Sequence, residues 1–276
     1  MANSHDESQD LVEERLMGTS RSHPGAGGGT PLVPTWANEA AGESAPIPAE
    51  APRRFVGFRT ALGKFVASGN PESMRGALRS YARTASGGAG VGARRIAPAT
   101  KALGALFSAI GAAQGSGTTA PETGGLTLDL AQLTGTPVEQ AIEAILDVLC
   151  PPGGPTDAEM VRAAMNEALA LMLASETTFD AAAITRDDAI VLLERYIGET
   201  LYSRIAIDGS KAFERTTDPV ALVHAENALR SFIAASVGAH LSEVLPLGGD
   251  LFSAAGVERA IAALVDRVWS DWREME

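Results

Sequence analysis

The sequence has little of what several classes of protein require. A single cysteine, Cys150, excludes an internal disulfide framework and a zinc site built from several thiolates. Aromatic residues make up only 5% of the chain, and no apolar run approaches the roughly 20 residues that a membrane-spanning helix needs. The acidic N-terminus lacks the basic and then apolar layout of a signal peptide. We therefore expect a cytoplasmic protein that does not enter a membrane.

The apolar residues that are present favour helices. They make up 45% of the 276 residues and are mainly Ala, Leu, Val and Ile, so we predict an all-α fold. Twenty of the 29 glycines lie at or before Gly125, which separates a loop-rich first part from a regular second part. We accordingly expect a tail over residues 1–52, a basic, glycine-rich and partly helical region over 53–117, and a C-terminal helical bundle over 126–276.

The first 52 residues have the composition of a disordered tail. They hold six prolines and the run Gly27 to Gly29, and they show almost no apolar periodicity. Such a segment cannot bury enough surface to offset the conformational entropy lost on ordering. The exception that we expect is a short helix over Ser8 to Met17, where three aliphatic side chains form a stripe.

The net charge of −12 is unevenly divided along the chain. Residues 1–52 carry −6 and residues 102–276 carry −15, whereas residues 53–101 carry ten basic groups against Glu72 alone, or +9. A basic segment of this kind attracts nucleic acid, an acidic protein surface or the acidic part of its own chain. Because it has few of the interleaved aromatic residues that stack on bases, we favour contact with protein and keep nucleic-acid binding as the alternative.

Capping residues predict where the helices begin. Asn70-Pro71 opens a helix that runs to about Arg83, and a further helix follows Pro98. Two stretches resist a helical interpretation and fit a short strand or turn, namely Leu126 to Leu130 and Ile205 to Ile207 before Asp208-Gly209. In the C-terminal region we expect helices to start near Thr136, Thr156 (with Glu159 completing a capping box), Thr185, Asp218 and Ser253.

The sequence motifs of nucleotide and metal chemistry are missing. Neither glycine run, Gly25 to Gly29 or Gly87 to Gly92, is followed by the residues of a phosphate-binding loop, so flexible linkage is the favoured role of both. The four histidines do not have the spacing of metal ligands. Arg94 and Arg95, beside exposed backbone amides, form a candidate anion site for a phosphate or a carboxylate. We predict no catalytic residue, no metal site and no cofactor.

Cys150 is expected to be structural. It lies at the C-terminus of a predicted helix, just before two prolines. The negative end of a helix raises the pKa of a thiol, which disfavours its use as a nucleophile.

A glycine near the start of the chain has the features of a conjugation site. Met17-Gly18 begins a stretch that formally matches the N-myristoylation pattern, although its internal position argues against lipidation. A start at Met17, or cleavage before Gly18, would leave a free glycine amine at the end of a long tail. With a pKa of about 7.7 to 8.0, such an amine is partly unprotonated and nucleophilic at neutral pH.

The string MGTSRSHPGAGGGTPLVPTWA, from Met17 to Ala37, and several shorter strings further along the chain resemble the QatB family of the bacterial Qat anti-phage system. The first string is the most specific, and the resemblance spans most of the chain from there. Residues 1–16 precede the usual start of the family and are expected to be a leader or an upstream extension. The other strings are Arg54-Phe55, Phe58 to Phe65, Ala77 to Tyr81, the glycine run before Arg94-Arg95, Cys150 to Gly154 and Ala164-Met165.

The resemblance implies a role in defence against phage beside an ATPase (QatA), a QueC-like enzyme (QatC) and a TatD-like nuclease (QatD). The chemistry would then reside in these neighbours, and this chain would be a non-enzymatic binding partner and protein substrate of QatC. QatC would attach a deazaguanine-type group to the amine of Gly18 after the preceding residues are removed. The residues expected to be modified or to bind the partner are Gly18, Thr19, Ser20, Pro31, Leu32, Val33, Pro34 and Trp36.

Overall fold

The computed structural model describes residues 53–116, 122–123, 126–154, 156–248 and 250–275. All of them belong to one compact unit, and they confirm the predicted all-α fold. The N-terminal segment 1–52, including the helix expected over Ser8 to Met17, lies outside the described residues.

Residues 53–116 form helices joined by tight connections. The helices are α2 (Val56–Ser68), α3 (Pro71–Ser80), α4 (Ala89–Arg95) and α5 (Ala97–Ala113), with a π-helix η2 (Tyr81–Ala85) directly after α3. The predicted start at Asn70 is confirmed, because its side chain accepts a hydrogen bond from the N–H of Glu72 at 2.8 Å. The flexible linkage expected over Gly87 to Gly92 is wrong. Only Gly87 and Gly88 form a turn, at φ +83° and +88°, and the rest of the run is the start of α4.

The C-terminal part consists mainly of longer helices. They are α6 (Val138–Leu149), α7 (Thr156–Met172), α8 (Arg186–Phe213), α9 (Pro219–Gly248) and α10 (Ala254–Glu274). The capping box of Thr185 with Asp188 and the cap at Ser253 are confirmed. The capping box expected for Thr156 is wrong, because the Glu159 carboxylate accepts the N–H of Gly153 instead.

Short elements lie between these helices. The stretch from Leu126 to Leu130 contains strand β2 (Leu126–Thr127), which pairs antiparallel with β1 (Glu122–Thr123), and the start of a 3-10 helix, η3 (Leu130–Leu133). A second 3-10 helix, η4 (Ala181–Ala183), precedes α8. The strand or turn expected at Ile205 to Ile207 is wrong, because these residues continue α8 without a break.

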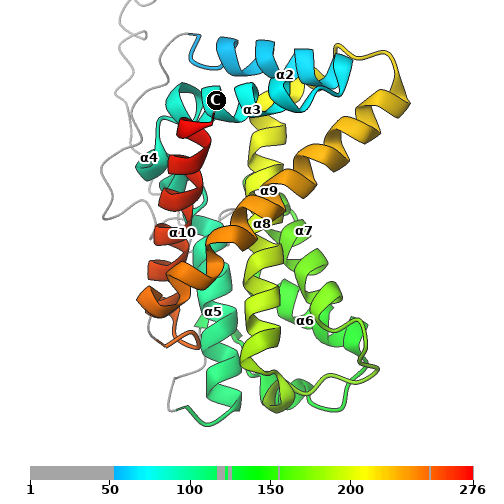
Figure 1. Cartoon of the computed structure of the whole chain (residues 1–276). Helices are drawn as coiled ribbons and strands as arrows, with labels where there is room; N and C mark the ends of the chain where they lie inside the picture. The colour runs from blue at the N-terminus through cyan, green and yellow to red at the C-terminus, as the bar shows by residue number, and fades with distance from the viewer. Residues whose placement is uncertain (1–52, 117–121, 124–125, 155, 249, 276) are drawn as a thin grey trace, which may run out of the picture. The chain divides into compact units, whose positions relative to one another are not determined.

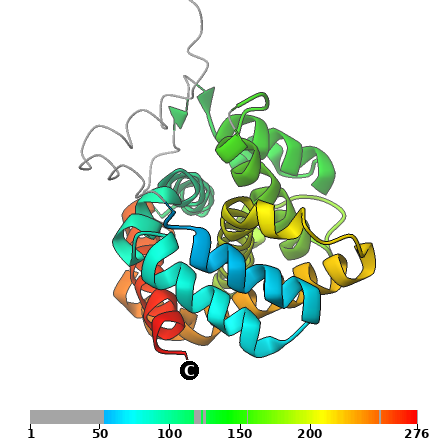
Figure 2. The same ribbon diagram turned by 90° about the horizontal axis from the view of Figure 1, so that it is seen from above.

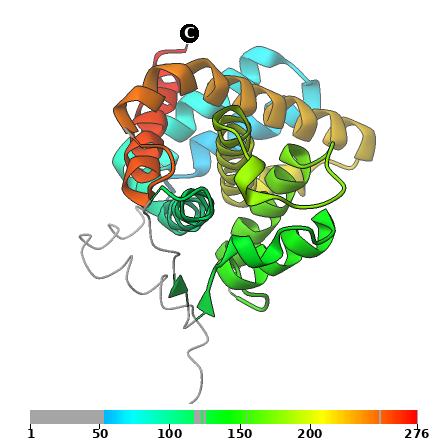
Figure 3. The same ribbon diagram turned by 90° about the horizontal axis from the view of Figure 1, so that it is seen from below.

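Helix α8 lies in the middle of the unit. It packs against α2, α7 and α9, while α10 packs against α3, α4, α5 and α9. Figures 1 and 2 show α2 and α3 side by side across one end of α8 and α10, with α10 and the α6–α7 pair on opposite sides of α8. Seen from below, α6 lies at the edge of the unit away from α10 (Figure 3).

One hydrophobic core connects the basic region to the C-terminal helices. The rings of Phe58 and Tyr81 lie 5.0 Å apart, those of Tyr81 and Trp269 6.1 Å apart, and those of Trp269 and Trp272 5.1 Å apart. These side chains come from α2, η2 and α10 and are almost completely buried. Burial of aromatic side chains contributes strongly to stability, so the two regions stabilise each other.

Within the described part of the chain, no single helix is both long and apolar enough to be a candidate membrane span. Helices α4 and α5 meet the length and composition test only as a pair, across a bend of 62°.

Candidate functional site

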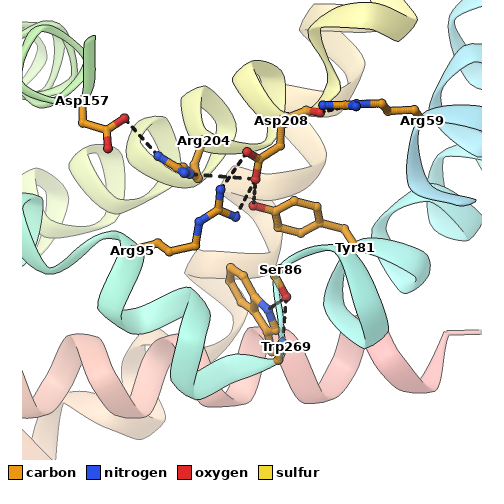
Figure 4. A network of polar contacts seen from close by, with 9 residues as sticks. Arg59, Tyr81, Ser86, Arg95, Asp157, Arg204, Asp208 and Trp269 are labelled. Carbon is orange, nitrogen blue, oxygen red and sulfur yellow. Dashed lines mark hydrogen bonds and ion pairs between the residues drawn. The ribbon is translucent and has the colours of Figure 1, made fainter. Parts of the chain in front are cut away.

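A buried aspartate on α8 is the centre of the largest polar network. The carboxylate of Asp208 is only 8% exposed, and it accepts hydrogen bonds from both terminal nitrogens of Arg95 at 2.7 and 2.8 Å. The Tyr81 hydroxyl donates to the same carboxylate at 2.8 Å, and the Nε atom of Arg204 lies 3.8 Å from it (Figure 4). Charge-assisted, two-pronged bonds of this kind are among the strongest in proteins.

The network joins α8 to several other elements. The Nε atom of Arg59, on α2, donates to the backbone carbonyl of Asp208 at 2.8 Å, and Arg204 pairs with Asp157 of α7 at 3.0 Å (Figure 4). Tyr81 and Arg95 come from η2 and α4. The Asp208 network therefore holds three elements of the basic region and the first turn of α7 against one stretch of α8.

Burial fixes the protonation state of the tyrosine in this network. Removal from water, followed by the nearby negative charge of Asp208, raises the pKa of Tyr81 far above its ordinary value. The hydroxyl therefore stays protonated and acts as a donor. With three short bonds from two donors, the carboxylate is well satisfied, which is the arrangement of a structural clamp.

Two basic residues of the same region stabilise the end of α10. Arg79 donates to the carbonyl of Met275 at 2.8 Å, and Arg83 donates to the carbonyl of Arg273 at 2.7 Å. The last carbonyls of a helix lack partners within the helix and carry partial negative charge, so cationic donors are favourable there. Four of the ten basic residues of segment 53–101 thus hydrogen-bond the acidic part of their own chain.

A second buried carboxylate, that of Glu199, lies on α8 nine residues before Asp208. Glu199 pairs with Arg195 at 3.4 Å and with Arg230 of α9 at 3.5 Å. Glu167 of α7 shares both arginines, with a close contact to Arg195 and a distance of 3.8 Å to Arg230. Burial, opposed by Arg230 and reinforced by the charge of Glu167, raises the pKa of Glu199. This Glu199 network connects α7, α8 and α9.

Of the site residues predicted from the sequence, the structure describes only Arg94 and Arg95. Arg95 holds the carboxylate of Asp208, and Arg94 lies beside it near the end of α4, where the amides of the glycine run are part of the helix. The other expected site residues, from Gly18 to Trp36, lie outside the described residues. Sequence reasoning missed Tyr81, Arg204 and Asp208. The sequence feature that could have pointed to this network is the single aspartate, Asp208, directly after the apolar residues Ile205 to Ile207.

The side chains of Cys150 and His240 are also held by contacts within the protein. Cys150 is buried, and burial raises the pKa of its thiol to about 12, with Arg162 partly opposing the shift. The thiol is therefore protonated at neutral pH, although burial rather than the helix end is the main cause. His240 pairs with Asp271 at 2.6 Å. In the described part of the chain, no group of three or more His, Cys, Asp or Glu residues is placed to hold a metal ion.

Comparison with known families identifies the family of this chain. The model of the family described as Qat anti-phage system associated protein QatB matches residues 87–271. The match runs from the turn before α4 almost to the end of α10, and it includes both Arg95 and Asp208. Comparisons with curated proteins and with solved structures gave no match. Since the family model covers more than half of the chain, the chain belongs to the QatB family of the Qat anti-phage system.

Proposed function

We propose that this chain is a non-enzymatic component of the Qat system that binds QatC, the QueC-like enzyme, and is modified by it at Gly18. The observation that carries the proposal is membership of the QatB family together with Met17-Gly18 at the head of a glycine-rich and proline-rich stretch. The proposal assigns the protein to the cytoplasm, beside the other Qat components.

The proposed chemistry needs a free N-terminal amine. Removal of residues 1–17 converts the amide nitrogen of Gly18 into a primary amine with a pKa of about 7.7 to 8.0. The unprotonated amine would form a new bond to the deazaguanine-type group in the activated form that QatC supplies, break the bond between that group and its leaving group, and lose one proton to solvent as the leaving group departs. Glycine suits this role because it has no side chain to hinder the attack.

The helical unit would bind QatC at a surface outside the enzyme's active-site pocket. The sequence predicts that residues 19–52 are an extended tail, which can reach into an enzyme pocket while the helices bind elsewhere on the same enzyme. Linking the two contacts raises the effective concentration of the amine at the pocket. The buried ionisable groups support a structural role for the helices, since Asp208 and Glu199 are paired with arginines and the thiol of Cys150 is protonated.

Intact-mass spectrometry tests the proposal. The full chain is purified from cells that contain active QatC or a QatC variant with its active site disabled. With active QatC we expect a chain that begins at Gly18 and carries an added mass on its first residue. The Gly18→Val variant should lose the added mass, whereas Gly25→Ala, in the same stretch, should keep it. An unmodified chain that still begins at Met1 in the presence of active QatC would refute the proposal.

A further inference from the structure

An open groove runs between α6 and α7 on the edge of the unit. It has a volume of about 510 Å³, and the apolar part of its floor is formed by Ile142 and Leu146 of α6 and by Ala163 and Ala170 of α7, with the exposed Asn166 between the two alanines along α7. The alanines are exposed, whereas the two larger side chains are largely buried. The small residues on the α7 side of the floor leave room for another element to approach closely, which makes this face different from an ordinary solvated helix surface.

The rim of the groove is acidic. Glu139 and Glu143 are exposed and lie one turn apart along α6, and Glu159 of α7 lines the groove as well. The basic group that lines the groove, Arg162, donates to Asp147 at 2.8 Å and to the carbonyl of Cys150 at 2.7 Å. Because this positive charge is paired with Asp147, the three glutamates leave the groove with a net negative charge.

The charge of the rim selects the occupant. Nucleic acid is repelled, and so is the N-terminal segment 1–52 of the same chain, which carries −6. A second copy that used the same face would bring Glu139 and Glu143 against their own counterparts. The geometry points to a basic amphipathic helix of a partner protein, with small aliphatic residues against the floor and Lys or Arg beside the rim.

The length of the groove sets the length of that helix. The lining residues of α7 run from Glu159 to Ala170, a span of about 16 Å at 1.5 Å per residue. About three helical turns therefore fit, with basic residues one turn apart opposite Glu139 and Glu143. This docking face belongs to the described helices, and its use does not depend on any modification of Gly18.

Fluorescence anisotropy with the full chain tests this inference. The probe is a fluorescein-labelled helical peptide of about 15 residues, with Leu and Ala on one face and Lys on both flanks. We expect saturable binding that weakens about tenfold or more in the variant Glu139→Lys/Glu143→Lys. The variant Ala163→Trp, which fills the groove and leaves the rim unchanged, should also weaken binding. Both sites are exposed, so these variants should fold normally.

Matched controls separate groove binding from general attraction between opposite charges. Glu214→Lys/Asp266→Lys changes the net charge by the same amount at two exposed positions, at the C-cap of α8 and on α10, and it should leave the affinity unchanged. Equal weakening by both double variants, or equal binding of a peptide with Glu in place of Lys, would overturn the inference. So would a dimer of the full chain, seen by light scattering, that Glu139→Lys/Glu143→Lys dissociates, because the occupant would then be a second copy.

Discussion

Two buried carboxylates on the same helix are stabilised in different ways. Asp208 accepts three hydrogen bonds of 2.7 to 2.8 Å from Arg95 and Tyr81. Glu199 lies 3.4 and 3.5 Å from arginines that it shares with Glu167. A short, two-pronged pairing offsets the cost of desolvation more fully than a long, shared one.

The difference corresponds to what each network connects. The Asp208 network binds the basic region, through α2, η2 and α4, to the centre of the unit. The Glu199 network connects α7, α8 and α9, which already have extensive apolar contact along their lengths. Loss of the first network should therefore weaken the attachment of a whole region, whereas loss of the second should be compensated by packing.

The replacement of Asp208 should have the largest effect. Asp208→Asn removes the negative charge that pairs with both terminal nitrogens of Arg95, whose guanidinium is only 7% exposed, so we expect the free energy of unfolding to fall by about 3–5 kcal/mol. Urea unfolding followed by circular dichroism measures this loss. The double variant Arg95→Met/Asp208→Asn should lose less than the sum of the two single variants, because both members of the pair are removed together. A loss below about 1 kcal/mol for Asp208→Asn would show that the pair is not a clamp.

The removal of the tyrosine hydroxyl should have the next largest effect. Tyr81→Phe keeps the ring between Phe58 and Trp269 but deletes one donor to Asp208, so we expect a loss of about 1.5–3 kcal/mol. The same unfolding experiment on Tyr81→Phe/Asp208→Asn completes a double-mutant cycle. Additive losses in the cycle would contradict the proposed coupling between the hydroxyl and the carboxylate.

A glycine beside each carboxylate allows a matched comparison of packing. A Cβ atom on Gly209 would overlap Cδ2 of Leu62 and lie 3.3 Å from the ring of Phe58, whereas one on Gly198 would meet Ala234 at an ordinary 3.6 Å. We expect Gly209→Ala to reduce stability by about 1–3 kcal/mol, because the buried side chain of Leu62 must shift to make room. Gly198→Ala should be neutral or should stabilise the protein by about 0.5–1 kcal/mol. Thermal unfolding of the two variants side by side checks the difference, and equal effects would contradict it.

The sequence predicts the local features of this molecule well. Asn70, Thr185 with Asp188, and Ser253 act on backbone groups two or three residues away, so their roles can be inferred from the printed order of residues. The tail over residues 1–52 is predicted from composition alone, and both the tail and its site residues stay a prediction because they lie outside the described residues. Local capping chemistry therefore gives these three helix starts, whereas the capping box predicted at Thr156 is wrong.

The sequence does not predict the Asp208 network, because its partners are far apart along the chain. Tyr81 precedes Asp208 by 127 residues, Arg95 by 113 and Arg59 by 149. Taken alone, Ile205-Ala206-Ile207 followed by Asp208-Gly209 resembles a strand and a turn. The helix continues because Arg95 neutralises the aspartate and because the glycine admits Leu62 of α2. Both reasons are tertiary, and no local pattern contains them.

The replacement of Glu199 should have the smallest effect, and its sign should depend on pH. Because the folded protein raises the pKa of Glu199 above its ordinary value of 4.5, the folded state holds this proton more tightly than the unfolded state does. The contribution of Glu199 to stability is therefore complete below about pH 4.5 and is lost as the pH rises through the raised pKa. Glu199→Gln cannot lose a proton, so it should change stability by less than about 1 kcal/mol at neutral pH. Relative to the unmodified chain, the variant should become more stable between pH 4.5, the ordinary pKa of the group, and about pH 7.5. Urea unfolding of both proteins at the two pH values measures this change, and the contributions of all other groups cancel in the difference. A difference that stays constant, or that falls with rising pH, would show that Glu199 is as firmly paired as Asp208.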